Sequence, residues 1–432
     1  MEFSVEAGLQ TVKFDLVLSL GLAALVLFVG YFVQRRVPFL SRTNVPAAAV
    51  GGLLFAGLVF ALHSWGVADL KLNTTLRAPL QTAFFTTIGL GATLGLLRVG
   101  GWRMGLFWLL ATLTAVVQNA VGMALAVALG APALLGIICG SLTLTGGPAT
   151  GQAWEARFAE LGVAGAGSLI IASALFGIFV SSLVANPAVT ALIRRRKLAH
   201  EGGGAEARSE EDEFWALSPT VAPEEFDEGQ RERASKKSES GSDVGVVLHN
   251  LLLVLLVMGA GAALSQLTRN PSFILPDYIW AMLLAGVVRN VDDRTGWFRL
   301  DARAVGVVAG VSLSLFLAIA LMSLELWKIA GLALPMLVIL CAQVLVMLLY
   351  AVLVTFPLMG RDYEAAVTAG GHVGFGLGIT ANAVANMEAL VERFAPAPRS
   401  FLVVPVVGAF FNDFTNALVI SLFVNLYINF AR

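Results

Sequence analysis

The sequence has few charged residues. Asp, Glu, Lys and Arg make up 13% of its 432 residues, whereas 57% are hydrophobic. Soluble globular domains average about 25% charged and about 45–50% apolar residues. The shortage of charge therefore excludes an ordinary soluble domain. Long apolar runs recur along almost the whole chain and predict an all-α polytopic membrane protein, because a helix satisfies its own backbone hydrogen bonds in lipid.

Net positive charge, cysteine and histidine are also scarce. The net charge of −1 argues against nucleic acid as a partner. The two cysteines, Cys139 and Cys341, lie in apolar runs and predict no disulfide framework. The four histidines form no cluster, and no nucleophile is paired with a base at membrane depth. We therefore expect neither an enzyme nor a bound cofactor.

Apolar runs long enough to cross a bilayer, about 20 residues each, occur ten times. The predicted spans are 15–34, 46–64, 78–97, 104–129, 162–193, 245–266, 274–290, 303–325, 331–356 and 400–429. Two further apolar segments, 133–157 and 364–392, are interrupted by glycine and polar residues. We predict that both are re-entrant hairpins, because irregular backbone at membrane depth must be buried in protein or line water.

A soluble segment divides the chain into two halves. Between Glu201 and Gly229 there are ten acidic residues and one basic residue. This composition cannot bury a core and predicts a disordered linker. The predicted organisation is therefore an N-terminal repeat over 1–195, an acidic linker over 196–244 and a C-terminal repeat over 245–432.

The two halves have similar layouts. Gln118 precedes Gly146 by 28 residues, and Gln343 precedes Gly370 by 27. Each half has five predicted spans, an odd number, so the second half would insert in the opposite direction. This pattern is typical of inverted-repeat transporters. Chance similarity between two apolar halves is the alternative.

Basic residues gather at the span ends that this arrangement places on one side. The clusters are Arg35, Arg36 and Arg42; Arg98 and Arg103; Arg194 to Lys197; and Arg289, Arg294, Arg299 and Arg303. Positive charge is enriched in cytoplasmic loops. We therefore predict a cytoplasmic linker and place both termini outside, on the opposite side of the membrane.

The two interrupted segments carry the chemistry that we expect at a substrate site. Glycine-rich turns and helix N-termini present backbone N–H groups that suit a carboxylate. Hydroxyl and amide side chains beside them could add hydrogen bonds, and His372 is either a hairpin-tip hydrogen bonder or a proton relay. Glycines that only permit close helix packing are the alternative. The predicted substrate-binding residues are Thr145, Gly146, Gly147, Thr150, Gln152, Gly371, His372, Gly374, Gly376 and Asp413.

Asp413 lies inside the last predicted span. An acid at membrane depth is expensive, which makes it a functional candidate that could pair with a substrate ammonium or a coupling cation. A salt bridge to Arg393 or Arg399 is the alternative. Asn382 and Asn386 are four residues apart and share a helix face, and their oxygens suit a hard cation or an interhelical hydrogen bond. The predicted Na⁺ ligands are Thr380, Asn382, Asn386, Asp413 and Asn416.

Six stretches of this sequence resemble one known family, the bacterial sodium/glutamate symporters. They are residues 80–90, 118–122, 140–147, 311–322, 371–378 and 401–411. The resemblance covers nearly all of both halves but not the linker. It departs in the first glycine segment, where Ala149 stands at the position of a central glycine. The second segment is one residue longer than the family pattern between its first glycine pair and the next glycine.

The resemblance implies a specific transport activity. It implies two inverted repeats of five spans with one re-entrant hairpin each, an elevator mechanism and a homodimer in the bacterial inner membrane. It also implies import of L-glutamate, with Na⁺ as the coupling ion. Symport of another carboxylate such as citrate, or a cation channel, are the alternatives. No Lys or Arg lies between Arg361 and Arg393 to favour the citrate alternative.

Overall fold

A computed structural model describes residues 2–6, 9–37, 45–198, 244–268, 276–324 and 332–430. The predicted linker falls outside the described residues except at its ends. The first half contains α1 (Leu16–Arg36), α3 (Ala47–Ser64), α4 (Arg77–Gly91), α5 (Leu94–Ala128), α6 (Ala133–Ile137), η1 (Ile138–Leu142), α7 (Gly147–Glu160) and α8 (Ala166–Arg196).

In the second half, as in the first, long helices come first and interrupted helices follow. Its elements are α11 (Val244–Leu267), α12 (Asp277–Thr295), α13 (Ala302–Met322), α14 (Ala333–Tyr350), η3 (Ala351–Thr355), α15 (Phe356–Met359), α16 (Tyr363–Leu377), α17 (Thr380–Arg393), α18 (Pro398–Val406), η4 (Val407–Phe411) and α19 (Asn412–Phe430). The elements η1, η3 and η4 are single π-helical turns.

Eight helical stretches in the described residues are long and apolar enough to cross a membrane. A polytopic membrane protein is therefore confirmed, and the other two predicted spans correspond to α4 and α12. Helix α4 has 15 residues, which reach only about 22 Å at the usual helical rise. Helix α12 carries charge in its last two turns, including Arg289 and Arg294. Hydropathy alone therefore does not qualify either as a full span.

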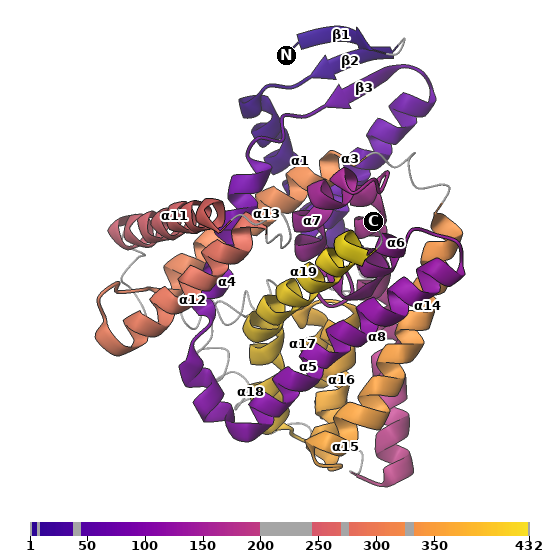
Figure 1. The fold of residues 1–432 in the computed structure, drawn as a ribbon, viewed down its shortest axis with the longest axis vertical. Coiled ribbons are helices and arrows are strands. Elements are labelled where there is room, and N and C mark those ends of the chain that lie inside the picture. The colour runs from indigo at the N-terminus through magenta and orange to yellow at the C-terminus, as the bar shows by residue number, and fades with distance from the viewer. Residues whose placement is uncertain are drawn as a thin grey trace.

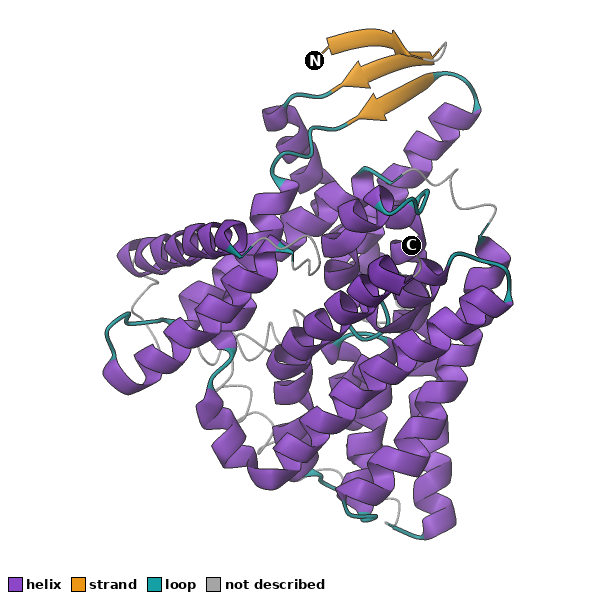
Figure 2. Ribbon diagram, in the orientation of Figure 1, coloured by secondary structure: helices purple, strands orange, loops and turns teal. Residues whose placement is uncertain are grey.

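A small β-sheet forms one end of the molecule (Figure 2). Strands β1 (Glu2–Glu6) and β2 (Leu9–Lys13) pair antiparallel, and β2 pairs parallel with β3 (Ala68–Lys71). The all-α prediction missed this sheet. The strands are short, and the partner of β2 is separated from it by two long helices, so no local pattern pointed to the pairing.

The helices pack as two bodies, and each body takes helices from both halves of the chain (Figure 1). Helices α1, α3, α4, α11, α12 and α13 pack on one another, and we call them the six-helix body. Elements α5 to α8 and α14 to α19 form the larger broken-helix body, which contains the main apolar core. The first three long helices of each half thus join one body, and the later elements of each half join the other.

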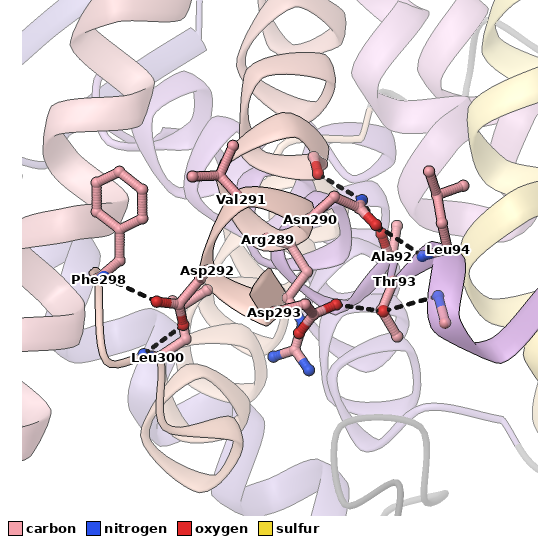
Figure 3. A network of polar contacts seen from close by, with 12 residues as sticks. Ala92, Thr93, Leu94, Arg289, Asn290, Val291, Asp292, Asp293, Phe298 and Leu300 are labelled. Atoms are coloured by element: carbon pink, nitrogen blue, oxygen red, sulfur yellow. Dashed lines mark hydrogen bonds and ion pairs between the residues drawn. The ribbon is translucent and has the colours of Figure 1, made fainter. Parts of the chain in front are cut away.

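The chain passes from the six-helix body to the broken-helix body at the start of α5. Asn290 of α12 accepts a hydrogen bond from Leu94 N at 2.8 Å and donates one to Ala92 O at 3.0 Å. Thr93 donates to Asp293, which also pairs with Arg289 (Figure 3). These contacts fix the connection to α12.

Candidate functional site

The breaks in the two interrupted segments meet in the broken-helix body. The first break lies between η1 and α7, and the second lies between α16 and α17. Gly147 has a φ of 67°, and a Cβ there would lie 2.9 Å from the Ile379 side chain. Gly177 of α8 is packed so closely that a Cβ would touch both Leu144 and the Leu377 carbonyl. The two segments that the sequence predicted as partners are therefore in contact.

Two helices begin at this meeting point. Helix α7 starts at Gly147 and α17 starts at Thr380, and each has 14 residues. A helix N-terminus carries about half a positive charge and favours anions. The convergence of two such termini creates a region that is electrostatically suited to a carboxylate.

Gln118 of α5 joins the two segments through both ends of its amide. Thr145 donates its hydroxyl to Gln118 Oε1 at 2.6 Å, and Gln118 Nε2 donates to the Gly376 carbonyl at 2.6 Å. Gln343 of α14 donates in turn to the Gln118 carbonyl, also at 2.6 Å. All of these side chains are buried. The glutamines at matching positions in the two halves therefore touch.

The glycines of the second segment lie within helix α16 rather than at its break. A Cβ at Gly371 would lie 2.6 Å from the sulfur of Met387, and one at Gly374 would lie 2.6 Å from the backbone nitrogen of Ala383. Helical N–H groups bond to carbonyls of the preceding turn. The expectation that these glycines free their N–H groups is therefore corrected: they allow close packing, and the chain breaks at Gly378.

The tip of the first segment is a tight turn with satisfied backbone groups. Gly146 N donates to the Ser141 carbonyl at 2.9 Å, and Gly147 N donates to the Thr143 carbonyl at 3.0 Å. Thr150 is buried one turn into α7. In this conformation the two glycine N–H groups are engaged within the turn, so they would reach a ligand only if the turn opened.

Two predicted site residues lie away from the break. His372 is buried within the helices, where its ring nitrogens lie 2.8 Å from the Thr355 hydroxyl and 3.2 Å from the Thr114 hydroxyl. Thr114 also donates to the Leu110 carbonyl, so the imidazole is the donor in its contact with Thr114. Gln152 faces α4, where its side-chain and backbone oxygens accept from Arg77.

The asparagines of α17 have different surroundings. Asn382 donates to the Ile178 carbonyl at 3.1 Å and to the Ser182 hydroxyl at 2.8 Å, both in α8. Asn386 is buried, and its Nδ2 makes no hydrogen bond with any residue that the structure describes. Thr380 faces Gly408 of η4. Asn382 therefore joins two helices, whereas Asn386 has unused hydrogen-bonding capacity.

Asp413 has no basic partner in the described part of the chain. It lies in the first turn of α19 and is partly buried. Arg399 pairs instead with Asp362 at 2.8 Å and with Glu364 at 3.0 Å. Arg393 lies over the ring of Phe394. The alternative of a structural salt bridge to Arg399 or Arg393 is therefore not found, and the acid remains a candidate for a charged ligand.

Each interrupted segment has an ion pair away from its break. Arg77 of the six-helix body pairs with Glu155 of α7. Arg399 of α18 pairs with Asp362 at the start of α16. Partial burial acts to raise the pKa of Asp362, but the Ala365 N–H and the Arg399 guanidinium outweigh it and hold that pKa below its usual value. Sequence reasoning missed Arg77, although it is a lone base at the edge of a predicted span.

A cavity of about 490 Å³ lies between the two bodies. The six-helix body contributes Met282, Asn290 and Arg294 to its wall, and the broken-helix body contributes Trp108 and Phe410. The wall is mainly apolar with a few polar groups, which is typical of small-molecule sites. The cavity reaches the network at the start of α5, where Figure 3 shows Asn290.

The fold and these contacts define a class: a polytopic helical membrane protein with two broken helices that meet in its interior. The sequence profile of the sodium/glutamate symporter family matches residues 12–396. The chain is 38% identical over 417 residues to the sodium/glutamate symporter of Escherichia coli K12, covering 96% of this chain and 98% of that protein. It is 35% identical over 404 residues to the sodium/glutamate symporter of Haemophilus influenzae, covering 93% and 95% respectively. The chain belongs to the sodium/glutamate symporter family.

Proposed function

We propose that this protein is a Na⁺-coupled symporter that imports L-glutamate across the bacterial inner membrane. The observation that carries this proposal is the match to proteins named sodium/glutamate symporters over nearly the whole chain. A transporter, rather than an enzyme, agrees with the family and with its apolar helices. Downhill Na⁺ entry supplies the work, because one charge crossing 100 mV provides about 2.3 kcal/mol.

The two bodies have different tasks in this proposal. The broken-helix body carries the substrate, and the six-helix body is the fixed scaffold against which it moves as an elevator. The division of each half between both bodies supports an inverted repeat. Such repeats commonly place the substrate at discontinuous helices near the bilayer midplane.

The substrate binds where α7 and α17 begin. The positive ends of these helices attract the glutamate carboxylates, and Asp413 balances the substrate ammonium or a coupling Na⁺. Opening of the first turn releases the Gly146 and Gly147 N–H groups to the ligand. Thr145 and Gln118 lie next to this turn and hold it against α16.

The cavity between the bodies is the route to the cytoplasm. Arg294 on its wall forms no ion pair with a described residue and attracts an anionic substrate. The network around Asn290 lies on the same side, which we assign to the cytoplasm because the basic clusters gather there. Both termini are then periplasmic and the linker is cytoplasmic.

A homodimer in the bilayer is also part of this proposal. Side chains along α1 are exposed, including Val17 at 78% and Phe28 at 72%. Lipid or a second copy of the chain would cover them. The mass of the purified protein–detergent complex, corrected for bound detergent, distinguishes a dimer from a monomer.

Transport of radiolabelled L-glutamate into proteoliposomes tests the function. We expect uptake with an inward Na⁺ gradient and none with choline in place of Na⁺. Asp413→Asn should lower the rate by about 100-fold, equivalent to about 2.7 kcal/mol, the scale of losing one partner of a buried charge pair. Glu160→Gln is the matched control, because this acid is exposed and its one ion pair among the described residues is with Arg157 on its own helix.

The outcomes separate the parts of the proposal. Uptake by Asp413→Asn at the wild-type rate would keep the function and remove the role of this acid. Folded wild-type protein that fails to take up glutamate in a Na⁺ gradient would refute the substrate, and citrate would then be tested in the same vesicles. Single-channel currents carried by Na⁺ would favour a channel instead.

A further inference from the structure

Ser141 sits where α5, η1 and α19 come together. Its backbone N–H donates to Asn119 Oδ1 at 2.9 Å, and its carbonyl accepts from Asn416 Nδ2 at 3.0 Å. Its neighbour Gly140 needs to lack a side chain, because a Cβ there would lie 2.7 Å from Asn119 Oδ1. The π-helical turn η1 is therefore hydrogen-bonded to one asparagine from each half of the chain.

Five buried polar atoms on η1 and on the two helices that contact it, α5 and α19, have no hydrogen-bond partner among the described residues. They are Ser141 Oγ, Asn119 Nδ2, Asn416 Oδ1, and both Oδ1 and Nδ2 of Asn412. All four residues are at most 1% exposed. A buried polar atom without a partner is costly, so such groups are rare in native proteins. Their occurrence on three elements that contact one another indicates that a polar group or ion binds here.

Three of the five atoms are oxygens: the Oδ1 atoms of Asn412 and Asn416, which only accept, and the Ser141 hydroxyl, whose lone pairs can also coordinate an ion. Ser141 Oγ and Asn416 Oδ1 belong to side chains that are joined through the Ser141 backbone. Asn412 lies four residues before Asn416 and therefore on the same face of its helix. Neutral hydroxyl and amide oxygens are preferred ligands of hard cations.

We propose that Ser141, Asn412 and Asn416 form a Na⁺ site. This inference rests on the proposed symport and adds Ser141 and Asn412 to the ligands expected from the sequence. In this proposal a water molecule completes the ion's shell and accepts from Asn119 Nδ2, since an amide N–H donates to oxygen and cannot bind a cation.

The site is connected to the substrate region through one backbone carbonyl. Ser141 O accepts from Asn416 and also from Gly146 N at 2.9 Å. An ion that binds Ser141 and Asn416 therefore lies one hydrogen bond away from the turn that leads to Gly147. This contact couples Na⁺ occupancy to the shape of the first break, where α7 begins.

Thermal unfolding of the purified full-length protein tests the site without requiring transport. NaCl is exchanged for choline chloride at constant ionic strength, with no glutamate present. Binding to the native state alone raises the unfolding temperature with Na⁺ concentration. We expect Ser141→Ala and Asn412→Ala to need about tenfold more Na⁺ than the wild type for the same rise in unfolding temperature. This difference corresponds to a loss of about 1.4 kcal/mol in Na⁺ binding.

Ser421→Ala is the matched control. Ser421 is a buried serine of α19 whose hydroxyl bonds within its own helix, to the Ala417 carbonyl at 2.8 Å. It should respond to Na⁺ as the wild type does. Asn412→Asp keeps the side-chain shape and adds a charge, so it should respond at lower Na⁺ concentration. This variant also tests the site if Asn412→Ala does not fold.

The outcomes distinguish the site from the transport function. Unchanged Na⁺ dependence in Ser141→Ala and in both Asn412 variants would overturn the site and leave a buried water as the explanation of the unpaired atoms. Na⁺-dependent stabilisation that these variants lose, in a protein without glutamate uptake, would support the site and refute the symport. In proteoliposomes Ser141→Ala should retain uptake at saturating Na⁺ while its half-saturating Na⁺ concentration rises about tenfold.

Discussion

The two glycine-rich segments look alike in sequence but use glycine differently. In the first, Gly147 adopts a positive φ where the chain turns. In the second, Gly371, Gly374 and Gly376 lie inside helix α16 and admit neighbouring groups. The first glycine therefore shapes the backbone, whereas the others shape the packing. A composition shared by two repeats does not imply a shared geometry.

The anchors of the two segments differ as well. Arg77 ties the first segment to the six-helix body, across the boundary between the bodies. Arg399 ties the second segment to α18, within its own body. Movement of one body past the other would have to break the first contact but could leave the second intact. The comparison predicts that the two ion pairs affect transport and stability in different ways.

The largest loss of stability is expected where a glycine lets the backbone of a neighbouring helix approach closely. Gly374→Ala would place a Cβ 2.6 Å from Ala383 N, and the helices α16 and α17 would have to move apart. Overpacking of this kind costs about 1–3 kcal/mol. Gly376→Ala should cost less, because its nearest neighbour is the flexible side chain of Met347. Thermal unfolding of both variants, followed by uptake, measures the difference, and equal losses would contradict this interpretation.

The amide of Gln118 should matter more than either of its contacts alone. Gln118→Met leaves the Thr145 hydroxyl and the Gly376 carbonyl without their partner, at about 1–3 kcal/mol for each buried group. Thr145→Val breaks only the contact with the first segment. We expect a larger loss of thermal stability for Gln118→Met. Equal losses would mean that the contact with Gly376 contributes nothing to holding the segments together.

The ion pair between the bodies should limit the transport rate. Arg77→Met removes its contacts with Glu155 and Gln152. We expect the maximal rate of glutamate uptake to rise by about 2- to 30-fold, the range for about 0.5–2 kcal/mol of altered coupling. Arg399→Met is the comparison and should lower stability without raising the rate. A lower rate in Arg77→Met would show that the pair supports the productive arrangement instead.

The smallest effect concerns acid stability. Because the pKa of Asp362 is held below its usual value, its pairing stabilises the protein at neutral pH and is lost as the pH falls through that lowered pKa. Asp362→Asn should therefore lose less stability than the wild type between neutral and acidic pH. Thermal unfolding over this range measures the effect, with Glu160→Gln as an exposed control. Parallel curves for wild type and Asp362→Asn would disprove the contribution.

Hydropathy gave a good prediction of the long helices. The run 15–34 corresponds to α1 and 303–325 to α13, because lipid requires continuous apolar helices whatever their neighbours are. The similar spacing from Gln118 and Gln343 to the glycines predicted an inverted repeat, and the structure adds that the two glutamines are hydrogen-bonded to each other. The chain also breaks within both interrupted segments, which could be seen in the sequence because glycine and polar residues stand out in apolar runs. Their re-entrance into a membrane stays a prediction.

Contacts between distant side chains could not be predicted. Nothing in the sequence around Ser141 indicates that Asn119 and Asn416 hold its backbone, because the three residues belong to elements that meet only in the folded protein. The same holds for Arg77, whose partners in α7 lie more than seventy residues away. His372 looked like a tip residue because its neighbours are glycines, but its ring is buried against Phe107, Tyr350 and Phe375.

The β-sheet has a consequence for how the chain is made. Strand β2 is synthesised before α1, but its parallel partner β3 follows α3. The pairing cannot form until both helices have been translated and both strands have reached the same face of the bilayer. Completion of the sheet therefore requires that α1 and α3 have both crossed the bilayer. If only one of the two helices crossed the bilayer, β2 and β3 would lie on opposite sides of the membrane, where no later folding step could join them.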